Sequence, residues 1–129
     1  MKRYVHEEGT ARVRRLLREG RIVTSRISEV EIASALARRR REGVLAAAAT
    51  TRALAALERD QAAWIIVEVT PTIAGETRAL LERYDLRAGD AIQLASCVHV
   101  QRRVKARIPL LTFDERQKTA ARAERVPVD

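Results

Sequence analysis

Short β-branched stretches alternate with longer amphipathic stretches along this chain, and that alternation restricts the fold more than any other feature. Residues 64–70, WIIVEVT, are typical of a strand, because β-branched side chains pack well on a pleated sheet. Residues 28–42 instead carry apolar side chains at helical spacing, and a glycine ends that stretch. Strands separated by helices predict an α/β sandwich with a mostly parallel sheet.

The same pattern predicts the individual elements. Helices are expected at Thr10–Glu19, Ser28–Glu42, Val44–Gln61, Pro71–Tyr84, Asp90–Ala106 and Glu115–Glu124. Strands are expected at Arg21–Ile27, Trp64–Thr70, Ile108–Phe113 and Val126–Val128. Two helices separate the first strand from the second and the second from the third, so the pattern leaves the direction of each strand open. A length of 129 residues is that of one domain, 1–129.

The net charge points to the kind of partner. Lys and Arg number 25 against 17 Asp and Glu, which gives a net charge of +8. Such a surface attracts polyanions, and the planar arginine side chain suits phosphate. Basic residues gather at the ends of two expected helices, at Arg38–Arg41 and at positions 102–107. These groups are either solvated helix ends, where cations suit the helix dipole, or contacts to an RNA backbone or an acidic partner.

Several classes of protein are disfavoured by composition. Aromatic residues are only 3% of the chain, too few for a binder of single strands built on stacking platforms. A single cysteine, Cys97, excludes an internal disulfide, and we interpret it as a packing group. No apolar run approaches the ~18 residues of a membrane span, and residues 1–10 show no signal-peptide stretch. A cytoplasmic protein without membrane contact is therefore expected.

Three carboxylates stand out by their position. Glu31 lies near the start of a helix that follows a strand, Asp90 follows a glycine at a helix start, and Asp114 lies between a strand and a helix. Each has an ordinary explanation: Ser28 and Glu31 have the spacing of a capping box, and both aspartates are good N-caps. Ligands of parallel sheets bind at the carboxyl ends of strands, where Asp114 is expected. Carboxylates gathered there would need a divalent cation, and Mg²⁺ and Mn²⁺ prefer oxygen ligands.

Four stretches taken together resemble the PIN-domain nucleases, and among them the VapC-type toxins of toxin–antitoxin pairs. These stretches are KRYVHEEGT, VTSRISEVEIASAL, LRAGDAIQLA and LLTFDERQKTAA, and they occur in the family's order over nearly the whole chain. The DAIQLA segment followed by TFDERQ is the most specific part. The resemblance implies a three-layer α/β/α sandwich around a parallel sheet and an endoribonuclease that depends on Mg²⁺ or Mn²⁺.

The resemblance also assigns roles to particular residues. It implies that Glu31, Asp90 and Asp114 are metal ligands and catalytic residues, and that Thr112 helps to place a water or the phosphate. It further implies a homodimer, an RNA substrate, and a cognate antitoxin that inserts a peptide near the active site. The arginines would hold the RNA backbone while a water attacks the phosphodiester.

One departure from the family pattern affects both fold and chemistry. Members usually begin with a short central strand that carries an aspartate, just before a segment like KRYV, whereas this sequence has Met1 at that point. We therefore expect an N-terminally shortened PIN-like domain without the first strand, and one metal rather than two. The alternative function is a weakly active or inactive PIN-like scaffold that binds RNA or antitoxin without turnover.

Overall fold

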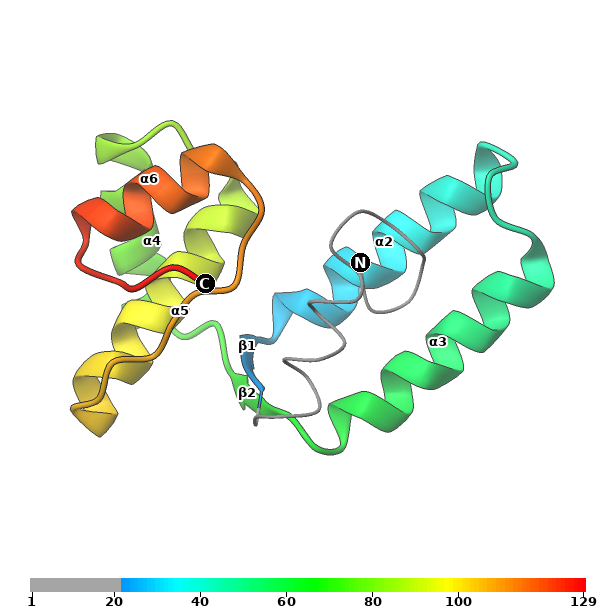
Figure 1. Cartoon of the computed structure of the whole chain (residues 1–129), viewed down its shortest axis with the longest axis horizontal. Helices are drawn as coiled ribbons and strands as arrows, with labels where there is room; N and C mark the ends of the chain where they lie inside the picture. The colour runs from blue at the N-terminus through cyan, green and yellow to red at the C-terminus, as the bar shows by residue number, and fades with distance from the viewer. Residues whose placement is uncertain (1–21) are drawn as a thin grey trace. The chain divides into compact units, whose positions relative to one another are not determined.

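Short strands and longer helices alternate in the computed structural model, which describes residues 22–129 (Figure 1). The elements are β1 (Val23–Ser25), α2 (Ile27–Arg41), α3 (Ala47–Gln61), β2 (Ile65–Val67), α4 (Pro71–Arg83), α5 (Ala88–Val104) and α6 (Glu115–Ala123). Strands β1 and β2 pair with each other. A mostly helical chain with a small parallel sheet confirms the predicted α/β class. The helix predicted at Thr10–Glu19 lies outside the described residues.

The chain divides into two compact units, with the boundary between Ile66 and Val67. The prediction of a single domain over 1–129 stays a prediction. No helix among residues 22–129 is both long and apolar enough to cross a membrane.

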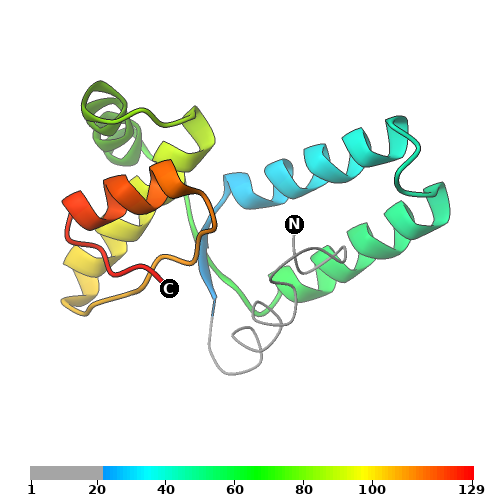
Figure 2. The same cartoon turned by 45° about the horizontal axis from the view of Figure 1, so that its top comes forward.

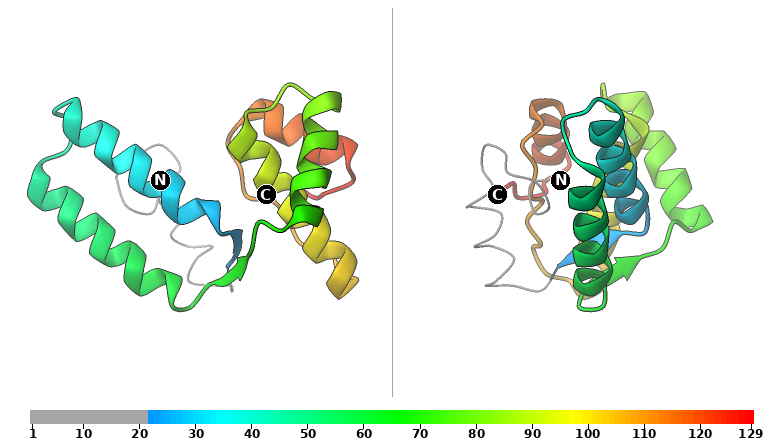
Figure 3. Two further views of the ribbon diagram at one scale, coloured as in Figure 1. Left: turned by 180° about the vertical axis from the view of Figure 1, so that it is seen from behind. Right: turned by 90° about the vertical axis from the view of Figure 1, so that its right-hand side faces the viewer.

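In the first unit, α2 and α3 form a helical hairpin (Figures 1 and 3). Leu36 of α2 and Leu57 of α3 are buried, as expected of the apolar sides of two packed helices. A hydrogen bond of 2.8 Å from Gln61 Nε2 to Glu29 Oε2 joins the end of α3 to the start of α2. Gly43 has a φ of +75°, a value that glycine adopts without strain, so it suits the turn after α2.

In the second unit, α5 packs against both α4 and α6 (Figure 3). Its buried core has two residues from each of the three helices and one from the segment after α6: Ile73, Leu80, Leu94, Ala95, Ala120, Ala121 and Val126. The small alanine side chains let α5 and α6 approach closely, and Leu94 at 0% exposure lies at the centre. This packing fixes the N-terminal ends of α5 and α6, where two of the predicted site residues are found.

The strands predicted at Ile108–Phe113 and Val126–Val128 shorten to one parallel bridge between Leu110 and Val128. Figure 2 accordingly draws the segments before and after α6 as coil rather than as strand arrows. The reason is that side chains of α5 use the backbone groups of Ile108. Its N–H donates to Gln101 Oε1 over 2.8 Å, and its carbonyl accepts from the Cys97 thiol over 3.5 Å. Pro109 follows and has no N–H to donate.

The core of the second unit gives a stability prediction. Leu94→Ala is expected to lower the free energy of unfolding by about 2–5 kcal/mol, because it removes a fully buried side chain and leaves a cavity. Leu81→Ala is the matched control, since Leu81 on α4 is 39% exposed and its loss leaves no cavity. Urea unfolding followed by circular dichroism measures both, and an equal effect of the two changes would contradict this description of the core.

Candidate active site

Two of the predicted carboxylates converge on one guanidinium group in the second unit. Nε of Arg87 lies 3.2 Å from Asp90 Oδ2, and Nη2 of the same side chain lies 3.9 Å from Asp114 Oδ2. The Asp90 and Asp114 side chains are 23% and 30% exposed. Both lie at helix N-terminal ends, where the backbone dipole favours negative charge.

Asp114 is held by its own backbone surroundings. Its Oδ1 accepts a hydrogen bond of 2.9 Å from the N–H of Gln117, which confirms the interpretation of Asp114 as the N-cap of α6. Its N–H donates to Thr112 Oγ1 over 3.1 Å, and Thr112 is only 8% exposed. The buried Thr112 hydroxyl thus fixes the backbone of Asp114, and only Oδ2 of that carboxylate faces Arg87.

Gln117 joins the two helix ends. Its side chain is 6% exposed, and its Nε2 donates a hydrogen bond of 3.1 Å to the carbonyl oxygen of Asp90. Its N–H is the group that Asp114 caps. One buried residue therefore links the backbone of α5 at Asp90 to the start of α6 at Asp114. This link fixes the position of one helix end relative to the other.

Two of the capping interpretations are wrong. Asp90 is the third residue of α5, whose N-cap is Arg87, so its carboxylate does not occupy the cap position. Helix α2 begins at Ile27 with Arg26 as its N-cap, so Ser28 lies inside the helix and does not open a capping box with Glu31. The Ser28 hydroxyl instead lies 2.5 Å from the Thr24 hydroxyl.

Glu31 lies in a different unit from the two aspartates. It is the fifth residue of α2, on an exposed part of that helix, and belongs to the first unit. Its participation with Asp90 and Asp114 stays a prediction.

The chemistry of the donor set fits a hard divalent cation. Asp90 and Asp114 offer carboxylate oxygens that already converge on one positive charge, and Mg²⁺ commonly uses one or two carboxylates with waters and substrate phosphates. Within residues 22–129 no group of three or more His, Cys, Asp and Glu side chains is arranged to hold a metal ion. The second unit therefore fits a site built on two protein carboxylates.

Sequence reasoning missed two residues of this arrangement, Arg87 and Gln117. Each lies three residues from an aspartate, at the spacing that brings side chains together over one helical turn. Gln117 also stands at the position of a capping box whose first residue is Asp114. A cap signal and an Arg-x-x-Asp spacing were available in the sequence, but the link from Gln117 to α5 depends on the packing of two helices.

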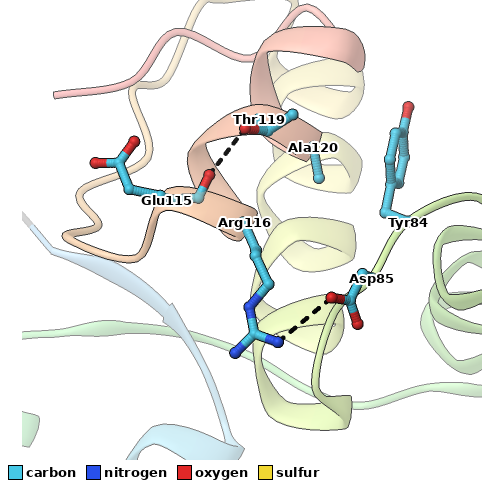
Figure 4. A pocket seen from close by; sticks show the side chains of 6 residues that line it. All are labelled: Tyr84, Asp85, Glu115, Arg116, Thr119 and Ala120. Atoms are coloured by element: carbon cyan, nitrogen blue, oxygen red, sulfur yellow. Dashed lines mark hydrogen bonds and ion pairs between the residues drawn. The ribbon is translucent and has the colours of Figure 1, made fainter.

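A shallow depression of about 240 Å³ lies between the end of α4 and one face of α6 (Figure 4). Its lining residues are Tyr84, Asp85, Glu115, Arg116, Thr119 and Ala120. Arg116 Nη1 pairs with Asp85 Oδ2 over 3.4 Å across it. Lys118, which donates to Glu115 over 2.8 Å, lowers the pKa of that carboxyl. The depression therefore carries side chains of both charges, and Asp114 is not among the residues that line it.

Cys97 packs against the core of the second unit. Burial raises the pKa of its thiol to about 11, because desolvation disfavours the thiolate. Its donation to the carbonyl of Ile108 fits a protonated thiol. This supports its interpretation as a packing group.

Comparison with known families adds one finding. A family model described as PIN domain matches residues 4–123. The matched range contains Glu31, Asp90, Thr112 and Asp114, and the small parallel sheet among helices is consistent with the α/β/α fold of that family. A comparison with curated proteins gives no significant match.

The pKa of Cys97 gives a pH prediction. In the folded chain the thiolate population at pH 8 is far below that of an ordinary cysteine, so alkylation by iodoacetamide is expected to be slow there and to speed up towards pH 11. The urea-unfolded chain is the control, with its rate rising around an ordinary thiol pKa. Equal alkylation rates in the folded and unfolded chains at pH 8 would contradict it.

The role of Asp114 as the N-cap of α6 gives a second stability prediction, which compares loss of the cap with loss of the charge alone. Asp114→Ala is expected to lower the free energy of unfolding by about 1 kcal/mol, because it removes the cap of α6. Asp114→Asn keeps an acceptor at the cap and is expected to unfold near the wild-type denaturant concentration. Urea unfolding checks both, and equal destabilisation by the two changes would show that the cap is not what Asp114 supplies.

Proposed function

Because the chain belongs to the PIN domain family, a family of nucleases, we propose that it is a metal-dependent endoribonuclease that acts as the toxin of a type II toxin–antitoxin pair. The observation that carries the proposal is the convergence of Asp90 and Asp114 on a single cation, Arg87. An acidic pair in a chain of net charge +8 suits metal-dependent phosphodiester hydrolysis, since the basic surface would bind the backbone and the acidic pair would hold the metal.

The chain's own residues prepare the site before any metal binds. Gln117 and Thr112 hold the backbones of Asp90 and Asp114, and the N–H of Gln117 also holds the Asp114 carboxylate, so less ordering is needed when a cation binds. Oδ2 of each aspartate is the oxygen that contacts the guanidinium of Arg87. In this proposal Asp90 and Asp114 hold Mg²⁺ or Mn²⁺, Glu31 is a further expected metal ligand, and Thr112 is a positioning residue for Asp114.

A divalent cation bound there supplies a nucleophilic water at neutral pH and neutralises charge that develops on the phosphate. Mg²⁺ and Mn²⁺ both accept oxygen ligands, so the donor set favours neither.

Exposed arginines offer contacts to the RNA backbone. Arg38, Arg40 and Arg41 stand at the C-terminal end of α2, and Arg102 and Arg103 at that of α5. Arg102 also pairs with Glu76 over 3.5 Å, at 71% side-chain exposure. Because such surface pairs contribute little to stability, these side chains remain available for phosphate.

Protein partners form the second part of the proposal. The expected partners are a cognate antitoxin and a second copy of the chain in a homodimer. The cytoplasmic location that we expect also belongs to this proposal.

Cleavage of RNA tests the enzymatic proposal. The purified chain with Mn²⁺ is expected to cut total RNA, and Asp90→Asn and Asp114→Asn are each expected to lower the rate at least 100-fold, because they remove a charge that holds the metal. Gel electrophoresis of the products measures the rate, with a chelator as a second control.

Asp85→Asn is the matched control for these variants. It removes the same type of charge from an exposed aspartate that pairs with Arg116 rather than with Arg87, so it should cut RNA at the wild-type rate. No cleavage by a folded wild-type chain that still binds RNA would instead favour the inactive scaffold.

A further inference from the structure

We propose that Arg87 occupies the place of the divalent cation between Asp90 and Asp114, and that it exchanges these carboxylates for an RNA phosphate when the cation binds. This inference rests on the proposed function and adds a residue that couples metal binding to RNA binding. Arg87 is thereby a positioning residue in one state and a substrate ligand in the other.

The contact atoms carry the first step. Arg87 uses two different nitrogens, Nε at 3.2 Å from Asp90 and Nη2 at 3.9 Å from Asp114, and both contacts go to an Oδ2 atom. Asp114 Oδ1 accepts from the N–H of Gln117, whereas Oδ2 is the oxygen of that carboxylate that faces the guanidinium. A metal bound to both aspartates would use the oxygens that Arg87 now contacts, and two positive charges at one place repel each other.

The exposure of Arg87 carries the second step. Its side chain is 72% exposed, so it can leave the carboxylates at little cost. Arg87 is the N-cap residue of α5, yet its side chain makes no capping hydrogen bond. The helix therefore keeps its N-terminal hydrogen bonds when the guanidinium moves away.

The chemistry of phosphate carries the third step. A guanidinium displaced from two carboxylates lies beside a metal site that the substrate phosphate must also reach. Arginine pairs with phosphate through two parallel N–H bonds, as it does with carboxylate. The guanidinium of Arg87 can therefore exchange its carboxylate partners for a phosphate while the backbone of α5 stays in place.

Manganese affinity tests the first half of the proposal. Isothermal titration with MnCl₂ is expected to show Arg87→Gln binding Mn²⁺ roughly threefold to tenfold more tightly than wild type, because two weak exposed ion pairs no longer compete. Arg87→Lys keeps the charge and should bind Mn²⁺ near the wild-type affinity. Arg116→Gln is the matched control, since Arg116 is also exposed but pairs with Asp85.

Binding of an uncleavable RNA tests the second half. Fluorescence anisotropy with a 2′-O-methyl oligonucleotide is expected to show a larger loss of affinity for Arg87→Gln in Mn²⁺ than in chelator. In Mn²⁺, the slope of log affinity against log salt concentration should be smaller for Arg87→Gln than for wild type by about the amount of one phosphate contact. A loss of equal size in both conditions would overturn the coupling, because Arg87 would then bind phosphate regardless of the metal.

The manganese titrations separate the two proposals. If wild type binds Mn²⁺ and Arg87→Gln binds it with the same or lower affinity, the role of Arg87 is overturned and the metal site stands. If neither chain binds Mn²⁺ while thermal unfolding shows both folded, the metal site and the inference are overturned together. If Arg116→Gln gains as much Mn²⁺ affinity as Arg87→Gln, the gain is a general effect of removing a positive charge. That result would also overturn the specific role of Arg87.

Discussion

Two neighbouring carboxylates repel each other, and the arrangement of the second unit depends on how positive charge offsets that repulsion. Asp90 and Asp114 lie at the N-terminal ends of α5 and α6, and Arg87 contacts both. The core beneath, with Leu94 at its centre, brings those helix ends together. Packing therefore decides where the charges lie, and charge balance decides which cation they hold.

Buried polar residues make the site precise. Gln117 and Thr112 are both nearly inaccessible, and each uses its side chain on the backbone of a site aspartate. A buried amide or hydroxyl that makes its hydrogen bond adds specificity, whereas an unsatisfied one would destabilise the fold. In this chain Gln117 and Thr112 hold Asp90 and Asp114 in place, a role that additional ligands would have in a site with more carboxylates.

Local signals in the sequence predicted much of this structure. The helices from α2 to α6 fall close to the expected ranges, because glycine, proline and apolar spacing act over a few residues. The cap at Asp114 was likewise predictable, while the cap assigned to Asp90 was wrong by three residues. What the sequence could not supply is long-range: the side chains of α5 that shorten the strand at Ile108, and the hydrogen bond from Gln117 to a residue 27 positions away.

The segment after α5 has a consequence for behaviour at high concentration. An open strand edge is a template on which a second molecule can add its own strand, and this is a route to aggregation. Around Ile108 the donor and the acceptor are already taken by Gln101 and Cys97, and Pro109 offers no donor at all. The chain thereby blunts part of its own edge from within, because a strand of a second molecule finds no backbone partner at Ile108.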